Sequence, residues 1–331
     1  MTIQRPARDE SSATLPRREF IQAAALGLLG AGALPLVSCA KPAPARGADS
    51  AADPEPPRPG ATAAVPAAGI ALQLYTVRDA IKADLAGTLR RVKSIGFDHV
   101  ETAFWPEGVT LTQAAQALRD AGLTAVASHI EIPQGANRQA MLDTAKAYGS
   151  THMIWHGWPE DRRYSTLEGT KELARIYNES SVIAKDNGLT FGVHNHWWEY
   201  RNTVGGRHPY EVLLEELSPD VFFEVDTYWV KVAGHVPAAV VAKLGARAQF
   251  LHIKDGPAVY HDNLAADNPD PMSPVGSGTQ DFPAIVKAAA GNTKWMVVEM
   301  DKVSGDVFSA LDQSYRYLTS NKLVRVGSPT A

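Results

Sequence analysis

The chain has 331 residues, of which 45% are hydrophobic, enough for a sizeable core. Its formal net charge is −4 at pH 7, so it has no net basic field to attract nucleic acid. The single cysteine, Cys39, excludes an internal disulfide.

Residues 1–39 have the pattern of an export signal. A polar segment carries Arg17-Arg18, and the apolar run that follows, Ala23 to Val37, is shorter than the roughly 20 residues of a membrane span. The arginine pair resembles a twin-arginine (Tat) signal, and Leu36-Val37-Ser38-Cys39 resembles a lipobox. A buried structural cysteine is disfavoured because Cys39 lies where signal cleavage would fall. We therefore expect an exported protein, lipid-anchored to the membrane on its periplasmic side through Cys39 and not spanning it.

Residues 40–68 are dominated by Ala, Pro, Gly and Asp and contain almost no large apolar side chain. Such a segment cannot bury enough surface to fold, so we expect a disordered tether. The folded domain is expected over residues 69–325.

Strand-like apolar runs alternate with helical segments through this domain. We expect strands at Ile70–Tyr75, His99–Ala103, Thr124–His129, His152–His156, Thr190–His194, Val221–Val225, Phe250–Ile253 and Trp295–Met300. Helices are expected at Ala80–Ser94, Gln113–Ala121, Asn137–Tyr148, Thr166–Asn187 and Val307–Ser320, and near Pro209, Pro237 and Pro283. Eight such units over about 250 residues predict an α/β fold, the (β/α)8 TIM barrel. A doubly wound sheet that binds a dinucleotide is disfavoured, because no glycine-rich loop follows the first strand.

Ionisable side chains gather where the predicted strands end, which is where a TIM barrel carries its active site. They are Glu101, His129, His156, His194, His196, Glu199, Glu224, Asp226, His252, Lys254, Asp255, Glu299 and Asp301. Any single one could be a hydrogen-bonded core residue or a helix cap. Crowded at one barrel mouth, they need a cation or hydrogen-bonding and charged partners to offset the cost of desolvation, and we expect a divalent metal ion. Imidazole with carboxylate favours Mn²⁺, Zn²⁺, Co²⁺ or Fe²⁺ over Ca²⁺, and Mg²⁺ stays open.

Five segments together resemble the xylose isomerase-like TIM barrels, also called sugar phosphate isomerases/epimerases and related to endonuclease IV. They are Leu72–Asp79, His194–His196 with Glu199, Val225–Trp229, His252–Asp255 and Val298–Asp301. The resemblance implies one catalytic divalent ion held by His194, Asp226, His252 and Glu299. His194 departs from the family's usual glutamate, so Glu199 is expected either to supply the missing carboxylate or to act as acid–base group. The resemblance further implies that Lys254 holds an oxyanion, with His129, His156 and His196 as additional active-site groups.

The resemblance implies a divalent-metal-dependent isomerase or epimerase that acts on a sugar or oxidised sugar through an enediolate. A lyase or dehydratase acting on a keto-sugar or 3-keto-glycoside is an alternative, and so is a non-catalytic carbohydrate-binding lipoprotein. Export favours free sugars, oxidised sugars or glycosides over sugar phosphates, and net charge disfavours a DNA-repair nuclease. The oligomeric state stays open. Tryptophans near strand ends are expected to pack on sugar rings, and residues 257–278 to form a lid; these tryptophans are Trp105, Trp155, Trp158, Trp197, Trp198 and Trp229.

Overall fold

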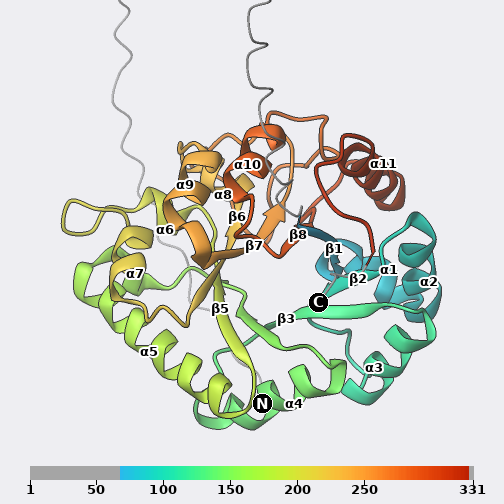
Figure 1. Ribbon diagram of the computed structural model, residues 1–331, viewed down its shortest axis with the longest axis horizontal. Helices are drawn as coiled ribbons and strands as arrows, with labels where there is room; N and C mark the ends of the chain where they lie inside the picture. The colour runs from blue at the N-terminus through green and yellow to red at the C-terminus, as the bar shows by residue number, and fades with distance from the viewer. Residues whose placement is uncertain (1–67, 328–331) are drawn as a thin grey trace, which may run out of the picture. The chain divides into compact units, whose positions relative to one another are not determined.

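The computed structural model describes residues 68–327, and its parallel strands close into a barrel in sequence order (Figure 1). Pairing of the first strand with the eighth, from Gly69 with Trp295 to Leu72 with Val298, completes the barrel. The strands are β1 Gly69–Gln73, β2 His99–Thr102, β3 Thr124–Ile130, β4 His152–Trp155, β5 Thr190–His194, β6 Phe222–Asp226, β7 Ala248–Ile253 and β8 Trp295–Val298. The prediction of a (β/α)8 barrel is confirmed, and each strand bound lies within two residues of its expected position.

Helices surround the strands on the outside of the barrel (Figure 1). They are α1 Arg78–Ala83, α2 Leu85–Ile95, α3 Leu111–Asp120, α4 Arg138–Tyr148, α5 Leu167–Asp186, α6 Trp198–Arg201, α7 Pro209–Glu216, α8 Thr227–Val232, α9 Pro237–Leu244, α10 Phe282–Ala289 and α11 Val307–Ser320. Among the described helices, none is long and apolar enough to cross a membrane.

The first predicted helix, Ala80–Ser94, is wrong as a single element. Asp84 adopts an extended backbone, with φ −154° and ψ 94°, and separates α1 from α2. Its carboxylate accepts a hydrogen bond from the Gly87 amide at 2.9 Å and so caps α2. The helix period continues across this break, which is why the sequence pattern did not reveal it.

The lower interior of the barrel is an apolar plug. Phe222, Phe250 and Trp295, the inward side chains near the starts of β6, β7 and β8, form a buried cluster with small aliphatic neighbours. A Cβ added to Gly192 on β5 would lie 2.4 Å from the Phe222 ring, so glycine there makes room for the aromatic side chain. This plug closes the barrel below the polar side chains described next.

The expected export signal, with Cys39, lies outside the described residues, as does the expected tether except for Ala68.

Candidate metal centre and active site

Strand periodicity carries polar side chains into the barrel above the plug. Successive side chains on a strand alternate between its faces, so residues two apart point the same way. On β6 this places Glu224 and then Asp226 above Phe222, and on β7 it places His252 above Phe250. All three polar residues are fully buried, which requires that each has a charged or hydrogen-bonding partner.

Four residues from adjacent strands converge near the top of the barrel. His194 ends β5, Asp226 ends β6, His252 is on β7, and Glu299 follows β8. One ligand atom from each lies within 4.8 Å of the others, and all four side chains are buried. The His194 Nε2 to Asp226 Oδ2 distance is 3.4 Å, and His252 Nδ1 lies 2.6 Å from Glu299 Oε2. These are the four residues that the family resemblance implied as ligands.

Hydrogen bonds orient one nitrogen of each of the two imidazoles toward this cluster. His194 Nδ1 donates to the His156 carbonyl at 3.0 Å, which leaves Nε2 unprotonated, buried and without a hydrogen-bond partner. His252 Nε2 lies 2.8 Å from Glu101 Oε1 and donates to it, which directs Nδ1 toward Glu299. Burial lowers the pKa of His252, but the surrounding carboxylates raise it well above its usual value, so a cation bound at Nδ1 would displace a proton. Two imidazole nitrogens facing two carboxylates form a donor set that fits a divalent cation.

A second cluster lies beneath the first and shares His252 with it. Ligand-type atoms of Glu101, His129, Glu224 and His252 lie within 4.8 Å of one another. His129 Nε2 is 2.6 Å from Glu224 and 3.1 Å from Glu101, and the Gln73 amide donates to Glu101 at 2.6 Å. These nitrogen–oxygen distances are those of hydrogen bonds. Burial lowers the pKa of His129, but the two carboxylates outweigh burial and raise it to about 9, so this imidazole is protonated at neutral pH.

Sequence reasoning missed what Glu101 and Glu224 do in this lower cluster. Both occupy strand ends, and the Glu224-Val225-Asp226 spacing was the available signal that two carboxylates share the inner face of β6. The structure shows that they hold His252 from below, on the side away from the proposed ligand atoms. Such partners orient a metal-binding histidine and fix its tautomer.

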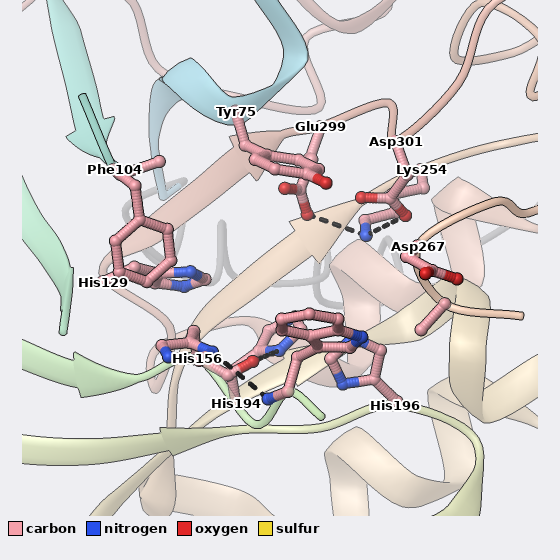
Figure 2. A pocket seen from close by; sticks show the side chains of 13 residues that line it. Tyr75, Phe104, His129, His156, His194, His196, Lys254, Asp267, Glu299 and Asp301 are labelled. Carbon is pink, nitrogen blue, oxygen red and sulfur yellow. Dashed lines mark hydrogen bonds and ion pairs between the residues drawn. The ribbon is translucent and has the colours of Figure 1, made fainter. Parts of the chain in front are cut away.

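Lys254 is a buried cation surrounded by carboxylates. Its Nζ lies 2.7 Å from Glu299 and 2.6 Å from Asp301 (Figure 2). It also lies 2.9 Å from Asp226, and the residue is 1% exposed. Burial lowers the pKa of Lys254, but these carboxylates raise it well above its usual value. Burial raises the pKa of Asp301 to about 6, despite the opposing effect of Lys254.

A pocket opens above the upper cluster, and its open space including the mouth is about 700 Å³. It is lined by Tyr75, Ala103, Phe104, His129, His156, Trp158, His194, His196, Lys254, Ala266, Asp267, Glu299 and Asp301. Figure 2 shows Glu299, Lys254 and Asp301 on one wall, with His156, His194 and His196 on the facing wall. The fully buried Asp226 and His252 lie outside the lining, and of the six expected tryptophans Trp158 alone is part of it. Ala266 and Asp267 belong to the predicted lid segment.

The histidines of the facing wall are neutral. Burial lowers the pKa of His156 to about 3, and its Nε2 lies 3.2 Å from Glu131. Burial also lowers the pKa of His196 well below its usual value, and this ring stacks on Trp198 with centroids 4.3 Å apart. His156 is engaged at both ring nitrogens, because its Nδ1 accepts a hydrogen bond from the Trp158 amide at 3.2 Å. His196 Nδ1 is buried without a hydrogen-bond partner, and a neutral imidazole can both donate and accept, so His196 is the imidazole suited to a hydroxyl group.

The structure does not bring Glu199 to the pocket or to either cluster. Glu199 is the second residue of the short helix α6, is 2% exposed, and accepts the His196 amide hydrogen bond at 3.0 Å. Burial raises its pKa to about 8. The expected ligand or acid–base role of Glu199 therefore has no geometric support, because the turn after β5 directs this side chain away from the pocket. Glu299 is the glutamate that lines the pocket.

Comparisons with known proteins agree with this architecture. A sugar phosphate isomerase/epimerase from Parabacteroides distasonis is 24% identical, with a TM-score of 0.64, and the match covers 78% of this chain and 100% of that one. The probable 3-DHS dehydratase AsbF from Bacillus anthracis (14% identity, TM-score 0.58) matches over 76% of this chain and 98% of its own. An L-ribulose 3-epimerase (14%, TM-score 0.55) matches over 79% and 100%. At these identities the likeness is one of fold.

No curated protein matches the sequence of this chain. A family model does match, over residues 89–320, which is more than half of the chain. The protein therefore belongs to the xylose isomerase-like TIM barrel family.

Proposed function

We propose that this protein is a divalent-metal-dependent isomerase or epimerase that acts on a sugar or an oxidised sugar. The observation that carries the proposal is the convergence of two imidazole nitrogens and two carboxylates beneath the pocket, from His194, Asp226, His252 and Glu299. An ion such as Mn²⁺, Zn²⁺, Co²⁺ or Fe²⁺, with Mg²⁺ also compatible, would act there as a Lewis acid toward a carbonyl and its neighbouring hydroxyl. Family membership supports the same reaction class.

The pocket wall formed by Glu299, Lys254 and Asp301, here called the lysine wall, would move the proton; the facing wall of His156, His194 and His196 is the histidine wall. Glu299 is the candidate base because its carboxylate lines the pocket and can reach a carbon held there. Burial raises the pKa of Glu299, but Lys254 and His252 lower it by more, so the net pKa is well below its usual value and the carboxylate is ionised. Lys254, 2.7 Å from Glu299, would stabilise by its charge the negative charge that develops on the substrate oxygen, while its three N–H donors stay on the carboxylates.

The facing wall would present groups to the opposite side of the substrate. His156 and His196 lie across the pocket from Glu299 (Figure 2). As a neutral imidazole, His196 would hold a substrate hydroxyl. Polar groups on both walls suit an epimerase as well as an isomerase. Two of the similar structures carry such names, a sugar phosphate isomerase/epimerase and an L-ribulose 3-epimerase.

The test is solvent exchange. Metal-loaded protein is incubated in D₂O with a panel of aldoses, ketoses and 3-keto-glycosides, and deuterium incorporation is located by NMR. We expect exchange at the carbon beside the carbonyl, loss of exchange in Glu299→Gln, and retention in Asp267→Asn, a matched carboxylate at the pocket mouth. Release of a substituent from the substrate would identify a lyase instead. Tight sugar binding without deuterium exchange would identify a carbohydrate-binding protein. Absence of exchange with every substrate would overturn the enediolate mechanism.

We also propose that the protein is exported and anchored through a lipid on Cys39. Arg17-Arg18 and the Leu36–Cys39 segment support this. Expressed in a bacterium with a Tat system, the full chain is expected in the membrane fraction, and Cys39→Ser is expected to leave it. Labelling by radioactive palmitate that persists in Cys39→Ser would contradict the proposal.

A further inference from the structure

Two aromatic side chains are exposed at the mouth of the pocket. Phe104, which follows β2, is 55% exposed, and Trp158, which follows β4, is 44% exposed. Among the described residues, these are the two aromatic side chains that are large, hydrophobic and exposed, and both line this pocket. The Phe104 ring meets His156 edge to face, with centroids 5.1 Å apart, so it is held in place from below (Figure 2). Exposed aromatic faces gathered at one site indicate a surface that a ligand covers.

The same pocket has no unpaired cation with which to hold a phosphate. Lys254 is the one lysine or arginine in the lining, and its Nζ already contacts three carboxylates within 2.9 Å. Two of them, Asp226 and Glu299, would balance a divalent ion, and Asp301 balances Lys254. Asp267 adds a further carboxylate at the mouth.

The arginine packed beside this pocket is also committed elsewhere. Arg78 stacks on the Tyr75 ring, 4.0 Å from its centroid, and lies outside the lining. Its guanidinium donates to the carbonyl oxygens of Tyr75 and Asp301 at 2.9 and 2.8 Å. A phosphate in the pocket would therefore face carboxylates without an arginine or a free lysine to compensate, which makes its desolvation costly.

We propose that the substrate is a neutral, unphosphorylated carbohydrate of at least two rings. The reacting ring occupies the space between the lysine and histidine walls, and the second ring lies on Phe104 and Trp158. The apolar face of a sugar ring packs against an aromatic ring, and its hydroxyls remain toward water at the mouth. This inference rests on the proposed function for the position of the reacting ring, and it names the substrate class of that same site.

The test compares binding of three kinds of probe to the full-length, Mn²⁺-loaded protein by calorimetry at constant ionic strength. The probes are glucose, the disaccharides cellobiose and maltose, and glucose 6-phosphate. We expect at least one disaccharide to bind about tenfold more tightly than glucose, and glucose 6-phosphate to bind no more tightly than glucose. Phe104→Ala and Trp158→Ala should each weaken disaccharide binding about fivefold and glucose binding less than twofold. Val182→Ala, an exposed apolar position outside the pocket, is the matched control and should change neither.

Each contrary result overturns the inference. Tighter binding of glucose 6-phosphate than of glucose would refute the neutral substrate. Equal weakening of glucose and disaccharide in the aromatic variants, or failure of all the probes to bind, would refute the second-ring site. Melting temperature and Mn²⁺ content, measured in each variant, separate a local effect from misfolding. If a disaccharide binds in a Trp158-dependent way but no deuterium exchange occurs, the proposed isomerase is refuted and this inference stands. If deuterium exchange occurs but binding does not depend on Phe104 or Trp158, this inference is refuted and the proposed isomerase stands.

Discussion

Replacing Glu199 by glutamine should stabilise the protein at alkaline pH. Burial raises the pKa of this carboxyl from 4.5 to about 8, so the folded protein keeps a proton that the unfolded chain has released. Unfolding free energy therefore falls as pH rises from 4.5 through 8, because over that range the native state binds more protons than the unfolded state. At about 1.4 kcal/mol per pH unit, the loss reaches roughly 5 kcal/mol. Glutamine cannot ionise and keeps an acceptor for the His196 amide, so the variant avoids this loss.

The assay is thermal unfolding of both proteins between pH 5 and pH 9. The two melting temperatures should be similar at pH 5, and the variant should be higher by on the order of 10 °C at pH 9. Other titrating groups contribute equally to both proteins and cancel in the comparison. Glu107→Gln, a change at an exposed carboxylate, is the control and should give no such divergence. Parallel curves, or a variant less stable at pH 9, would refute the reasoning. Because Glu199 lies outside the pocket, deuterium exchange should survive the change, and its loss at normal metal content would make Glu199 catalytic after all.

Three further predictions concern the two clusters and Lys254. Removal of metal by a chelator should lower the melting temperature, since an ion at 100 times its dissociation constant adds about 3 kcal/mol to stability. If metal analysis shows that the ion has been removed and the melting temperature is unchanged, the folded protein has no such site. Glu224→Gln should weaken metal binding by about 10- to 100-fold in calorimetry, because one of the carboxylates that orient His252 from below loses its charge; unchanged affinity would mean that the lower cluster does not position the ligand. Lys254→Met should lower the free energy of unfolding, measured in urea, by about 3–5 kcal/mol, because Asp301 is left buried without its cation. The control Lys302→Met, at an exposed lysine, should lower it little. Equal effects of the two changes would count against a stabilising role of the buried ion pairs.

Much of the barrel could be predicted from the chain because its signals are local. Buried parallel strands are continuous apolar runs, and glycines after helices mark their ends, so all eight strands were found within two residues. The break at Asp84 was not predicted, because the helical period of the sequence continues across it and hides the capping residue. The short helices α6 and α8 also escaped, since they begin within five residues of a strand end, and Asp226 caps α8 through the amides of Tyr228 and Trp229.

The candidate site was predictable to the extent that it depends on strand ends. His194, Asp226, His252 and Glu299 were named as ligands from the family resemblance, and the structure brings their ligand atoms together, although their binding of an ion stays a prediction. The direction of the Glu199 side chain could not be predicted because four residues separate it from the end of β5, and the turn there decides where it points. No local pattern reports that direction.

The amino-acid sequence is enough to predict the fold class and to place imidazoles and carboxylates at the barrel mouth, because strand period and strand order follow from neighbouring residues. Which groups face one another across the barrel depends on the folded structure. It pairs Lys254 with Asp301 and Glu299, holds His252 from below with Glu101, and brings Phe104 and Trp158 to the lining of one pocket. These residues lie on different strands and loops, tens of residues apart or more, and only closure of the barrel brings them together.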